Sequence, residues 1–326
     1  MAANNTHHEA EELRDAFGQT LLELGQQYES LIFLDADLHT STKATLFKKR
    51  FPDRFVQVGI AEQNLFGVAA GLASEGFVAM PSTFAAFAAR RALDQIAISI
   101  CFPKLNVKIP GSYCGVPTSR AGASHNCIED LAIMRAIPHL LVADPGTNAD
   151  LRAVMQTAMA TPGPVYFRVA RYAVPELFDK NHRFEWGKGE ILREGTDVTL
   201  FGTGIMTMFC LDAADLLARI GIEAEVIHLA SVKPIDRDLI TQSVEKTSCA
   251  VTVENASIYG GLGDAVSEVL AETCPAPLQR IGVRDRFVES GGIDELFARH
   301  GMTPTDIARA AQKALKKNTT YKVLSS

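Results

Sequence analysis

The sequence predicts an α/β protein made of two doubly wound domains. Strand-like and helix-like segments alternate along nearly the whole chain, which is typical of parallel sheets covered by helices. The length of 326 residues fits two domains of ordinary size. The composition, 47% hydrophobic and 21% charged, is that of a globular protein with sizeable cores. We place the first domain at residues 1–175, a linker at 176–190 and the second domain at 191–326.

The first domain is expected to open with an amphipathic helix over residues 9–27. The expected strands are 31–34, 55–58, 77–80, 105–109, 140–142 and 165–169. The expected helices follow Glu62 and cover 84–100, 128–135 and 148–159. The segment 110–124 is rich in Gly, Ser and Pro and is predicted to be a long irregular loop. Such loops are usually functional in compact domains.

A polar stretch without periodicity, near 175–190, is interpreted as the linker. In the second domain the expected strands are 198–201, 224–229, 250–254 and 278–283, with helices ending near 220 and 273 and two closing helices. The glycine turns at 202–204 and 260–263 each follow a strand and open a helix. Neither completes a nucleotide-binding pattern, so we interpret both as tight turns.

The bulk composition excludes several classes of function. The net charge of −6 and the absence of a basic block argue against nucleic-acid binding. No apolar stretch approaches the ~20 residues needed to span a bilayer, so no membrane partner is expected. The first residues lack the features of a signal peptide, and the six cysteines are scattered without metal-ligand spacing. We therefore expect a cytoplasmic protein with reduced thiols.

The most informative stretch is Gly59–Asn64, which contains Glu62. It lies between the alternating strand 54–58 and a helix of small residues, so Glu62 is expected near a helix N-terminus at the carboxyl end of a strand. Ligands bind at such places in α/β sheets. A carboxylate in so apolar a setting is either paired or protonated, because burial raises its pKa. On position alone, a helix-capping role is the simpler interpretation.

Several further motifs follow Glu62 in a fixed order. They are 81–88 (PSTFAAFA), 93–96 (LDQI), 105–108 (LNVK), 124–132 (SHNCIEDLA) and 163–168 (GPVYFR). In this order and at these intervals, the chain resembles the second half of a transketolase, which comprises the pyrimidine-binding and C-terminal domains. The resemblance extends from about residue 14 to about residue 310. Each motif is moderately specific, whereas the ordered set is strongly so.

This resemblance implies an enzyme that uses thiamine diphosphate. In the family, a glutamate hydrogen-bonds N1′ of the aminopyrimidine and favours the tautomer that accepts the thiazolium proton, and Glu62 matches it. Phe84 and Phe87 match aromatic residues of the pyrimidine pocket, Phe84 being the better match for the stacking position. On spacing alone they are equally consistent with core phenylalanines. His125 matches a histidine of the substrate channel, where proton relay is expected.

The resemblance also implies residues that lie near the entrance to the cofactor site and residues that contact the substrate. Asp37 matches an acidic residue near the cofactor entry, and Ser41 matches a contact to the substrate phosphate. Either residue could equally serve a turn or a helix cap. Arg168 or Arg171 should match the arginine that binds the sugar phosphate, and we favour Arg171, because a guanidinium suits bidentate binding of phosphate.

The chain departs from the family pattern in the loop before His125. Many transketolases carry a histidine and an aspartate there, in contact with sugar hydroxyls or phosphate. Counting back from His125, this sequence has Tyr113 and Ala121, with Arg120 beside the latter as a further candidate for substrate binding. The departure puts the ordinary pentose phosphates in doubt and makes an unusual or anionic sugar plausible.

The diphosphate-binding half of a thiamine enzyme is missing from the sequence. In the family, a Gly-Asp-Gly motif and a later asparagine hold the Mg2+ that binds the diphosphate, and no Gly-Asp-Gly occurs here. The resemblance therefore implies one subunit of a split transketolase, in which an N-terminal partner subunit supplies Mg2+ and the diphosphate site. It also implies an α2β2 assembly and an inactive isolated chain.

Three alternatives stay open. The β subunit of a 2-oxoacid dehydrogenase E1 has a similar length and domain order, but its reaction decarboxylates a 2-oxoacid. A fragment of a deoxyxylulose-phosphate synthase fits less well, because that family is usually one long chain. A non-catalytic paralogue that only binds a partner is the third, against which the combination of Glu62 and Phe84 argues.

Overall fold

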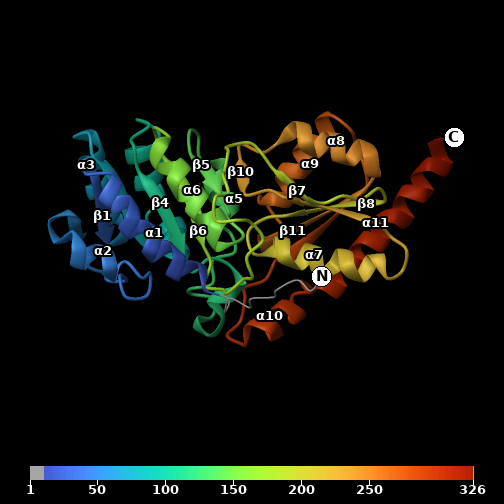
Figure 1. Cartoon of the computed structure of the whole chain (residues 1–326), viewed down its shortest axis with the longest axis horizontal. Helices are drawn as coiled ribbons and strands as arrows, with labels where there is room; N and C mark the ends of the chain where they lie inside the picture. The colour runs from blue at the N-terminus through green and yellow to red at the C-terminus, as the bar shows by residue number, and fades with distance from the viewer. Residues whose placement is uncertain (1–10, 326) are drawn as a thin grey trace, which may run out of the picture.

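The computed structural model describes the backbone of residues 11–325 and the side chains of residues 11–318. Two α/β domains lie side by side, the first at the blue and green end of the molecule and the second at the orange and red end (Figure 1). Each domain has one sheet of mainly parallel strands with helices on both faces. The predicted fold class is confirmed.

The first sheet has seven strands in the order β10-β5-β6-β4-β3-β1-β2. They are β1 (Leu31–Asp35), β2 (Phe55–Gln57), β3 (Val78–Phe84), β4 (Lys108–Ser112), β5 (Leu141–Ala143), β6 (Val165–Val169) and β10 (Ser231–Lys233). All neighbours pair in parallel except β10 and β5, which are antiparallel. β1, β3, β4 and β6 are buried throughout, as parallel strands covered on both faces must be.

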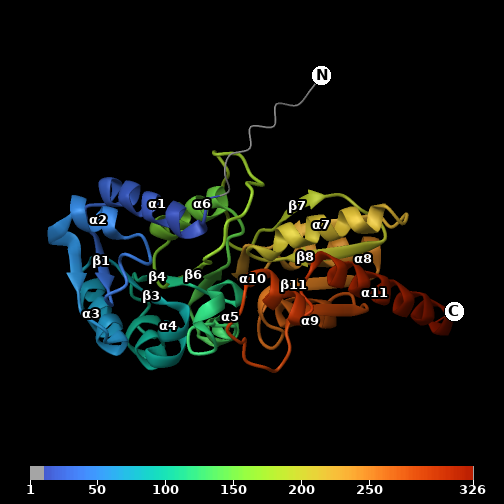
Figure 2. The same cartoon turned by 90° about the horizontal axis from the view of Figure 1, so that it is seen from below.

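Helices cover both faces of the first sheet (Figure 2). One layer holds α1 (Leu13–Gln27), α2 (Thr45–Arg50) and α6 (Asn148–Ala160). The other holds α3 (Glu62–Ser74), α4 (Ala85–Arg91), α5 (Asp130–Ala136) and the π-helical η2 (Gln95–Cys101). In α1, Leu13, Phe17 and Leu21 are buried at four-residue spacing, which is the apolar stripe expected of a helix packed on a sheet.

The second sheet has five strands in the order β12-β11-β8-β9-β7. They are β7 (Glu190–Arg193), β8 (Val198–Gly202), β9 (Ala224–His228), β11 (Ala250–Ser257) and β12 (Leu278–Val283). Helices α7 (Met206–Ala218) and α11 (Pro304–Ser325) cover one face, and α8 (Arg237–Thr247) and α9 (Leu262–Glu272) cover the other (Figure 1). The short α10 (Ile293–Arg299) packs near the 3-10 turn η3 (Val116–Ala121) of the first domain.

The structure corrects several predicted elements. The single helix expected over 84–100 is two helices, α4 and η2, because the backbone leaves helical geometry at Ala92, and Phe84 itself ends β3 in extended geometry. The strand expected at 105–109 is shifted to β4, and the loop 110–124 contains the end of β4 and the turn η3. Elements α2, β7, β10 and α8 were not predicted. The helix expected from residue 9 begins at Leu13, and residues 9 and 10 lie outside the described residues.

The stretch expected to be a polar linker bonds to both domains, since the carbonyl of Phe184 accepts from Oγ1 of Thr157 and the N–H of Gly189 donates to Asp236. Phe184 is buried, and its ring makes an edge contact with Trp186. His182 stacks on Phe178 with ring centroids 4.1 Å apart. The proposed boundaries at 175 and 191 stay a prediction, and β10, which follows them in sequence, belongs to the sheet of the first domain.

Within residues 11–325, no helix is both long enough and apolar enough to cross a membrane.

Candidate functional site

Most of the residues predicted for the site gather at one edge of the first sheet. Because β1, β2, β3, β4 and β6 are parallel, their carboxyl ends lie at the same edge. Asp37 follows β1, Phe84 ends β3 and Tyr113 follows β4. Arg171 follows β6, and Glu62 begins the helix that comes after β2.

Glu62 is the first residue of α3 and its side chain is buried. The Nη1 atom of Arg91 lies 3.1 Å from Oε1 of Glu62, so of the two states expected for this carboxylate the structure shows the paired one. The carboxylate also lines a cavity of about 540 Å³ together with Gln63, Asn64 and Arg90. A buried acid at the wall of a cavity, with one partner that reaches in from the surface, can exchange that partner for a ligand.

Four aromatic rings form a cluster beside this cavity. The ring of Phe84 stacks on Tyr113 at 4.3 Å and on Phe87 at 5.6 Å between centroids. His125 makes edge contacts with Phe84 at 6.0 Å and with Phe87 at 5.3 Å. The structure therefore brings together Phe84, Phe87 and His125, as the sequence analysis expected. It adds Tyr113, the residue that departs from the family pattern.

Two arginines flank Tyr113. Nη1 of Arg14 donates to the Tyr113 hydroxyl at 2.7 Å, and the Arg171 guanidinium lies 5.5 Å from the centre of the ring. The backbone carbonyl of Ser41 accepts from Arg14 at 3.4 Å. Arg14 was not predicted, because nothing in helix 9–27 distinguishes it from a solvated surface arginine. Glu12, which pairs with Arg14, is its acidic neighbour.

Asp37 is exposed, and its backbone N–H donates to Oε1 of Gln57 at 3.0 Å. The neighbouring Asp35 is the buried carboxylate. It accepts from Nε2 of Gln57 at 2.6 Å and lies 3.1 Å from Nδ1 of His39. Asp35 therefore orders the turn after β1, and it leaves the Asp37 side chain in solvent at the edge of the sheet.

Arg168 does not reach the site. Its side chain is buried, with Nε and Nη2 bonded to Asp130 at 2.8 and 3.0 Å and Nη1 bonded to Asp144 at 3.1 Å. Nη2 also donates to the carbonyl of Asn255 in the second domain. All these donors are used inside the protein, whereas Arg171, the other candidate arginine, is exposed.

The loop that carries His125 is held by Arg90. This arginine pairs with Glu129 and donates to the carbonyls of Ala123, Ser124 and Asn126. Although burial opposes ionisation of Glu129, its contacts with Arg90 lower the pKa of that carboxyl below its usual value. Nδ1 of His125 lies 2.8 Å from Oγ of Ser124.

Arg120 and Ala121 lie at the end of η3, and both are exposed. The carbonyl of Arg120 accepts from Oγ of Ser290, a residue of the second domain. The 3-10 turn thus ties this loop to the second domain. Among residues 11–318, the structure describes no contact between the Arg120 side chain and the aromatic cluster.

Two family models match successive parts of the chain. The transketolase pyrimidine binding domain matches residues 10–176, and the transketolase C-terminal domain matches residues 187–307. This chain belongs to the transketolase family. The 6-deoxy-6-sulfo-D-fructose transketolase subunit SqwH of Clostridium sp. is 43% identical over 94% of the chain and 95% of its own length. A subunit of the apulose-4-phosphate transketolase of Phocaeicola vulgatus is 36% identical over 93% and 97%.

A solved structure of a split-gene transketolase, an inactive β4 tetramer, is 49% identical to this transketolase-family chain. It superimposes with a TM-score of 0.88 and covers 93% of this chain and 98% of its own. The transketolase of Campylobacter jejuni is 21% identical with a TM-score of 0.79, which shows the shared fold, and this chain covers 47% of it. The chain is therefore a split transketolase-family subunit.

The residues at the sheet edge fit half of a thiamine diphosphate site. Glu62 supplies a buried carboxylate at a cavity wall, and Phe84 and Phe87 supply aromatic faces beside it. Among residues 11–318, whose side chains are described, no group of three or more His, Cys, Asp or Glu side chains could hold a metal ion.

Proposed function

We propose that this chain is the pyrimidine-binding subunit of a thiamine diphosphate-dependent transketolase. Together with an N-terminal partner subunit that holds Mg2+ and the diphosphate, it transfers a two-carbon ketol unit from a ketose, or ketose phosphate, to an aldose or aldose phosphate. The observation that carries this proposal is the buried Glu62 carboxylate at a cavity wall, beside the Phe84–Phe87 pair and His125.

When bound, thiamine diphosphate supplies the carbanion that carries the two-carbon unit. Glu62 would hold N1′ of the aminopyrimidine through a hydrogen bond, and burial would strengthen that bond, because few waters compete for the carboxylate. Phe84 and Phe87 orient the ring and exclude water from one side. His125, beside both rings, moves protons to and from the sugar oxygens.

The anionic end of the sugar is bound by Arg171 and Arg14 around Tyr113. Two guanidiniums within 6 Å of one ring, of which that of Arg14 also donates to the tyrosine hydroxyl, suit a phosphate or sulfonate group. Two relatives carry the names of anionic sugars, a sulfofructose and apulose 4-phosphate. The Ser41 carbonyl accepts from Arg14, which supports Ser41 as a substrate contact, and the exposure of Asp37 at the sheet edge supports its proposed role near the cofactor entry.

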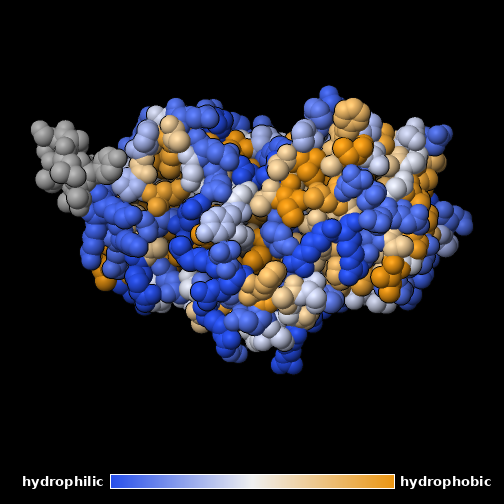
Figure 3. All heavy atoms as spheres, turned by 180° about the vertical axis from the view of Figure 1, so that it is seen from behind, coloured by the Kyte–Doolittle hydropathy of each residue, from blue (hydrophilic) through white to orange (hydrophobic). Residues whose placement is uncertain are grey.

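The partner covers exposed apolar side chains of this chain. Ile60, two residues before Glu62, is 75% exposed, and Ile98 and Phe102 of the η2 region are 60% and 79% exposed. Apolar side chains reach the surface at several places on the rear face of the molecule (Figure 3). Surfaces of this kind are typical of subunit contacts. The 49% identical structure, an inactive β4 tetramer, supports a β chain that needs its partner, and we expect α2β2.

The test is to purify the chain with a co-expressed protein that carries the Gly-Asp-Gly motif, in the presence of thiamine diphosphate and Mg2+. Native mass spectrometry should show an α2β2 complex with bound cofactor, and that complex should transfer ketol units from sugar donors. The Glu62→Ala complex should assemble but lose turnover. Normal activity of that variant would contradict the catalytic assignment.

The same complex separates the alternatives. Turnover of a 2-oxoacid with acyl transfer to a lipoyl domain would favour the E1 β subunit instead. The chain spans about half of several 1-deoxy-D-xylulose-5-phosphate synthases, for example 47% of that of Geobacter sulfurreducens at 37% identity, so pyruvate belongs among the donors screened. A complex that binds no cofactor would favour a non-catalytic partner-binding role.

A further inference from the structure

Arg91 occupies an unusual position at the candidate site. It is the last residue of α4, and its guanidinium reaches back to Glu62, at the start of α3, with an Nη1–Oε1 distance of 3.1 Å. The arginine side chain is 52% exposed, whereas the glutamate side chain is only 5% exposed. The pair therefore consists of a fixed buried acid and a cation that can swing out into solvent.

The same guanidinium lies on an aromatic face. The Cζ atom of Arg91 is 4.1 Å from the centroid of Phe87, one helical turn earlier in α4. This distance is within the range of a cation–π contact. Arg91 thus contacts two groups at once, the carboxylate of Glu62 and the ring of Phe87.

The cofactor's aminopyrimidine would need the same two groups. In the tautomer that the family glutamate favours, N1′ carries a hydrogen, so the cofactor presents a flat ring with an N–H donor, and the guanidinium is also flat with N–H donors arranged in a plane. A carboxylate that accepts from the donor and an aromatic face that covers the plane can serve either group. The space around Glu62 is a cavity of about 540 Å³, which Arg90 and Arg91 also line.

We propose that Arg91 is an internal substitute for the aminopyrimidine. In the cofactor-free subunit it fills the place between Glu62 and Phe87, keeps the buried carboxylate paired, and moves into solvent when the cofactor enters. This inference rests on the proposed function. It adds that cofactor binding is a competition with a side chain of the same subunit.

A competition of this kind weakens the apparent affinity for the cofactor. The apparent dissociation constant is the intrinsic one divided by the fraction of open sites, so an arginine that fills the site nine-tenths of the time weakens binding roughly tenfold. Removal of a positive charge near an anionic ligand would by itself weaken binding. A tighter complex in an Arg91 variant can therefore not be a simple charge effect.

The experiment is isothermal titration calorimetry of thiamine diphosphate into the apo-complex with the partner subunit, at fixed Mg2+. We expect Arg91→Ala and Arg91→Met to bind the cofactor several-fold to tenfold more tightly than the wild type. The methionine variant keeps an aliphatic chain over Phe87 and so controls for a change in packing. Arg91→Lys keeps the charge but not the flat donor group. Its dissociation constant should fall between those of the wild type and Arg91→Ala.

The control is Arg309→Ala in α11, which makes the same change of charge with a side chain that is 71% exposed. Its dissociation constant should equal that of the wild type. Unchanged or weaker binding in both Arg91→Ala and Arg91→Met would overturn the proposal and would make Arg91 a direct contact of the cofactor. If the wild-type complex binds no thiamine diphosphate, the proposed function itself fails, which is a separate result.

Discussion

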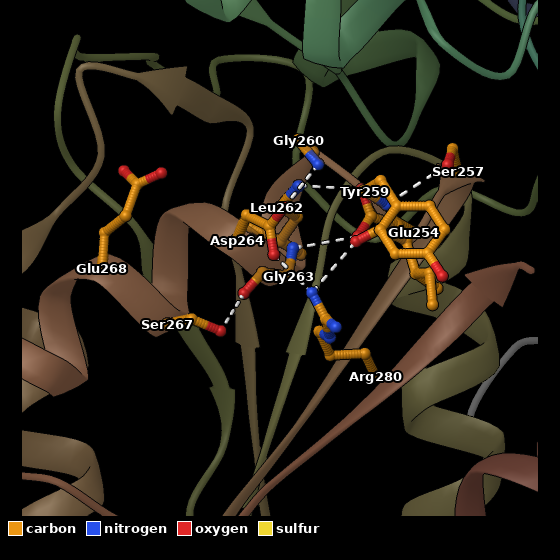
Figure 4. A network of polar contacts seen from close by, with 12 residues as sticks. Glu254, Ser257, Tyr259, Gly260, Leu262, Gly263, Asp264, Ser267, Glu268 and Arg280 are labelled. Carbon is orange, nitrogen blue, oxygen red and sulfur yellow. Dashed lines mark hydrogen bonds and ion pairs between the residues drawn. The ribbon is translucent and has the colours of Figure 1, made fainter.

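Glu62 and Glu254 are two buried carboxylates, one in each domain: Glu62 begins α3, and Glu254, in β11, meets the N-terminus of α9 with its side chain. Glu62 bonds to a half-exposed side chain at the wall of a cavity. Glu254 accepts from the backbone N–H groups of Leu262 and Gly263 at 2.8 and 2.9 Å, at the start of α9 (Figure 4). Burial raises the pKa of Glu254 to about 7 despite these bonds.

The two carboxylates differ in the kind of partner that they bind, and this difference distinguishes a ligand site from a structural contact. The partners of Glu254 are fixed parts of the backbone, and nearby glycines leave room for its carboxylate, since a Cβ on Gly261 would lie 1.9 Å from its Oε2. The partner of Glu62 is a side chain that solvent can release. A buried acid whose partners cannot leave stabilises the fold, whereas one whose partner can leave is free to meet a ligand.

The largest expected effect is on turnover, when Glu62 or Glu254 is replaced by glutamine in the active complex. Glu62→Gln should lower kcat by roughly a hundredfold or more, the usual contribution of a positioned acid–base group. Glu254→Gln should retain turnover at a temperature where it is folded. Steady-state kinetics of the two complexes checks this, and equal losses would remove the distinction between the two acids.

The second prediction concerns pH and Glu254 alone. Between about pH 4.5 and 7 the folded protein keeps this carboxyl protonated while the unfolded chain ionises it, so the folded state binds more protons and its stability falls as the pH rises. The shift corresponds to about 3 kcal/mol. Urea unfolding of the wild type should therefore lose stability relative to Glu254→Gln from pH 5 to pH 8. A constant difference would contradict the prediction.

The third prediction compares two glycines. Gly261→Ala forces a methyl group against Oε2 of Glu254 and should destabilise the chain by about 1–3 kcal/mol. Gly67→Ala, in the interior of α3, meets open space and should stabilise the isolated chain by about 0.5–1 kcal/mol, because alanine restricts the unfolded chain more than glycine does. Thermal melts of the isolated subunit measure both changes in stability. If the two variants changed stability in the same direction, the predicted contrast between the two glycines would be wrong.

The smallest effect is expected at a third buried carboxylate, Asp150, whose partners are histidines. Nε2 of His182 lies 3.4 Å from Oδ1 of Asp150, and Nε2 of His228 lies 2.9 Å from Oδ2. Although burial opposes it, the close contact with Asp150, with the charges of Asp150 and Glu190, raises the pKa of His182 above its usual value. Its stabilising contribution is therefore complete below about pH 6.5 and is lost as the pH rises through the folded-state pKa.

We expect His182→Gln to be less stable than the wild type by under about 1 kcal/mol at pH 6. The difference should shrink toward pH 8, as measured by urea unfolding at a series of pH values. A difference that grew with pH would mean that His182 acts as a neutral hydrogen-bond partner rather than as a cation.

The sequence allowed the fold class, most strands and the main site residues to be predicted, because these depend on local periodicity and on motifs of fixed order. The side chains that complete the site could not be predicted in this way. Arg91 and Arg14 reach across 29 and 99 residues to Glu62 and Tyr113, and an arginine in a helix looks the same whether it faces solvent or a ligand. The helix α8 and the edge strands β7 and β10 were missed because they are short or strongly polar.

Strand β10 has a consequence for how such enzymes can be divided into genes. It leaves the second domain to pair with β5 at the edge of the first sheet, while the Asn255 side chain and carbonyl bond to Val116 and Arg168. A polypeptide cut near residue 180 would leave an open sheet edge and an incompletely paired buried arginine, and both halves would tend to aggregate. We therefore expect a break between genes to fall outside the unit that these two domains form together.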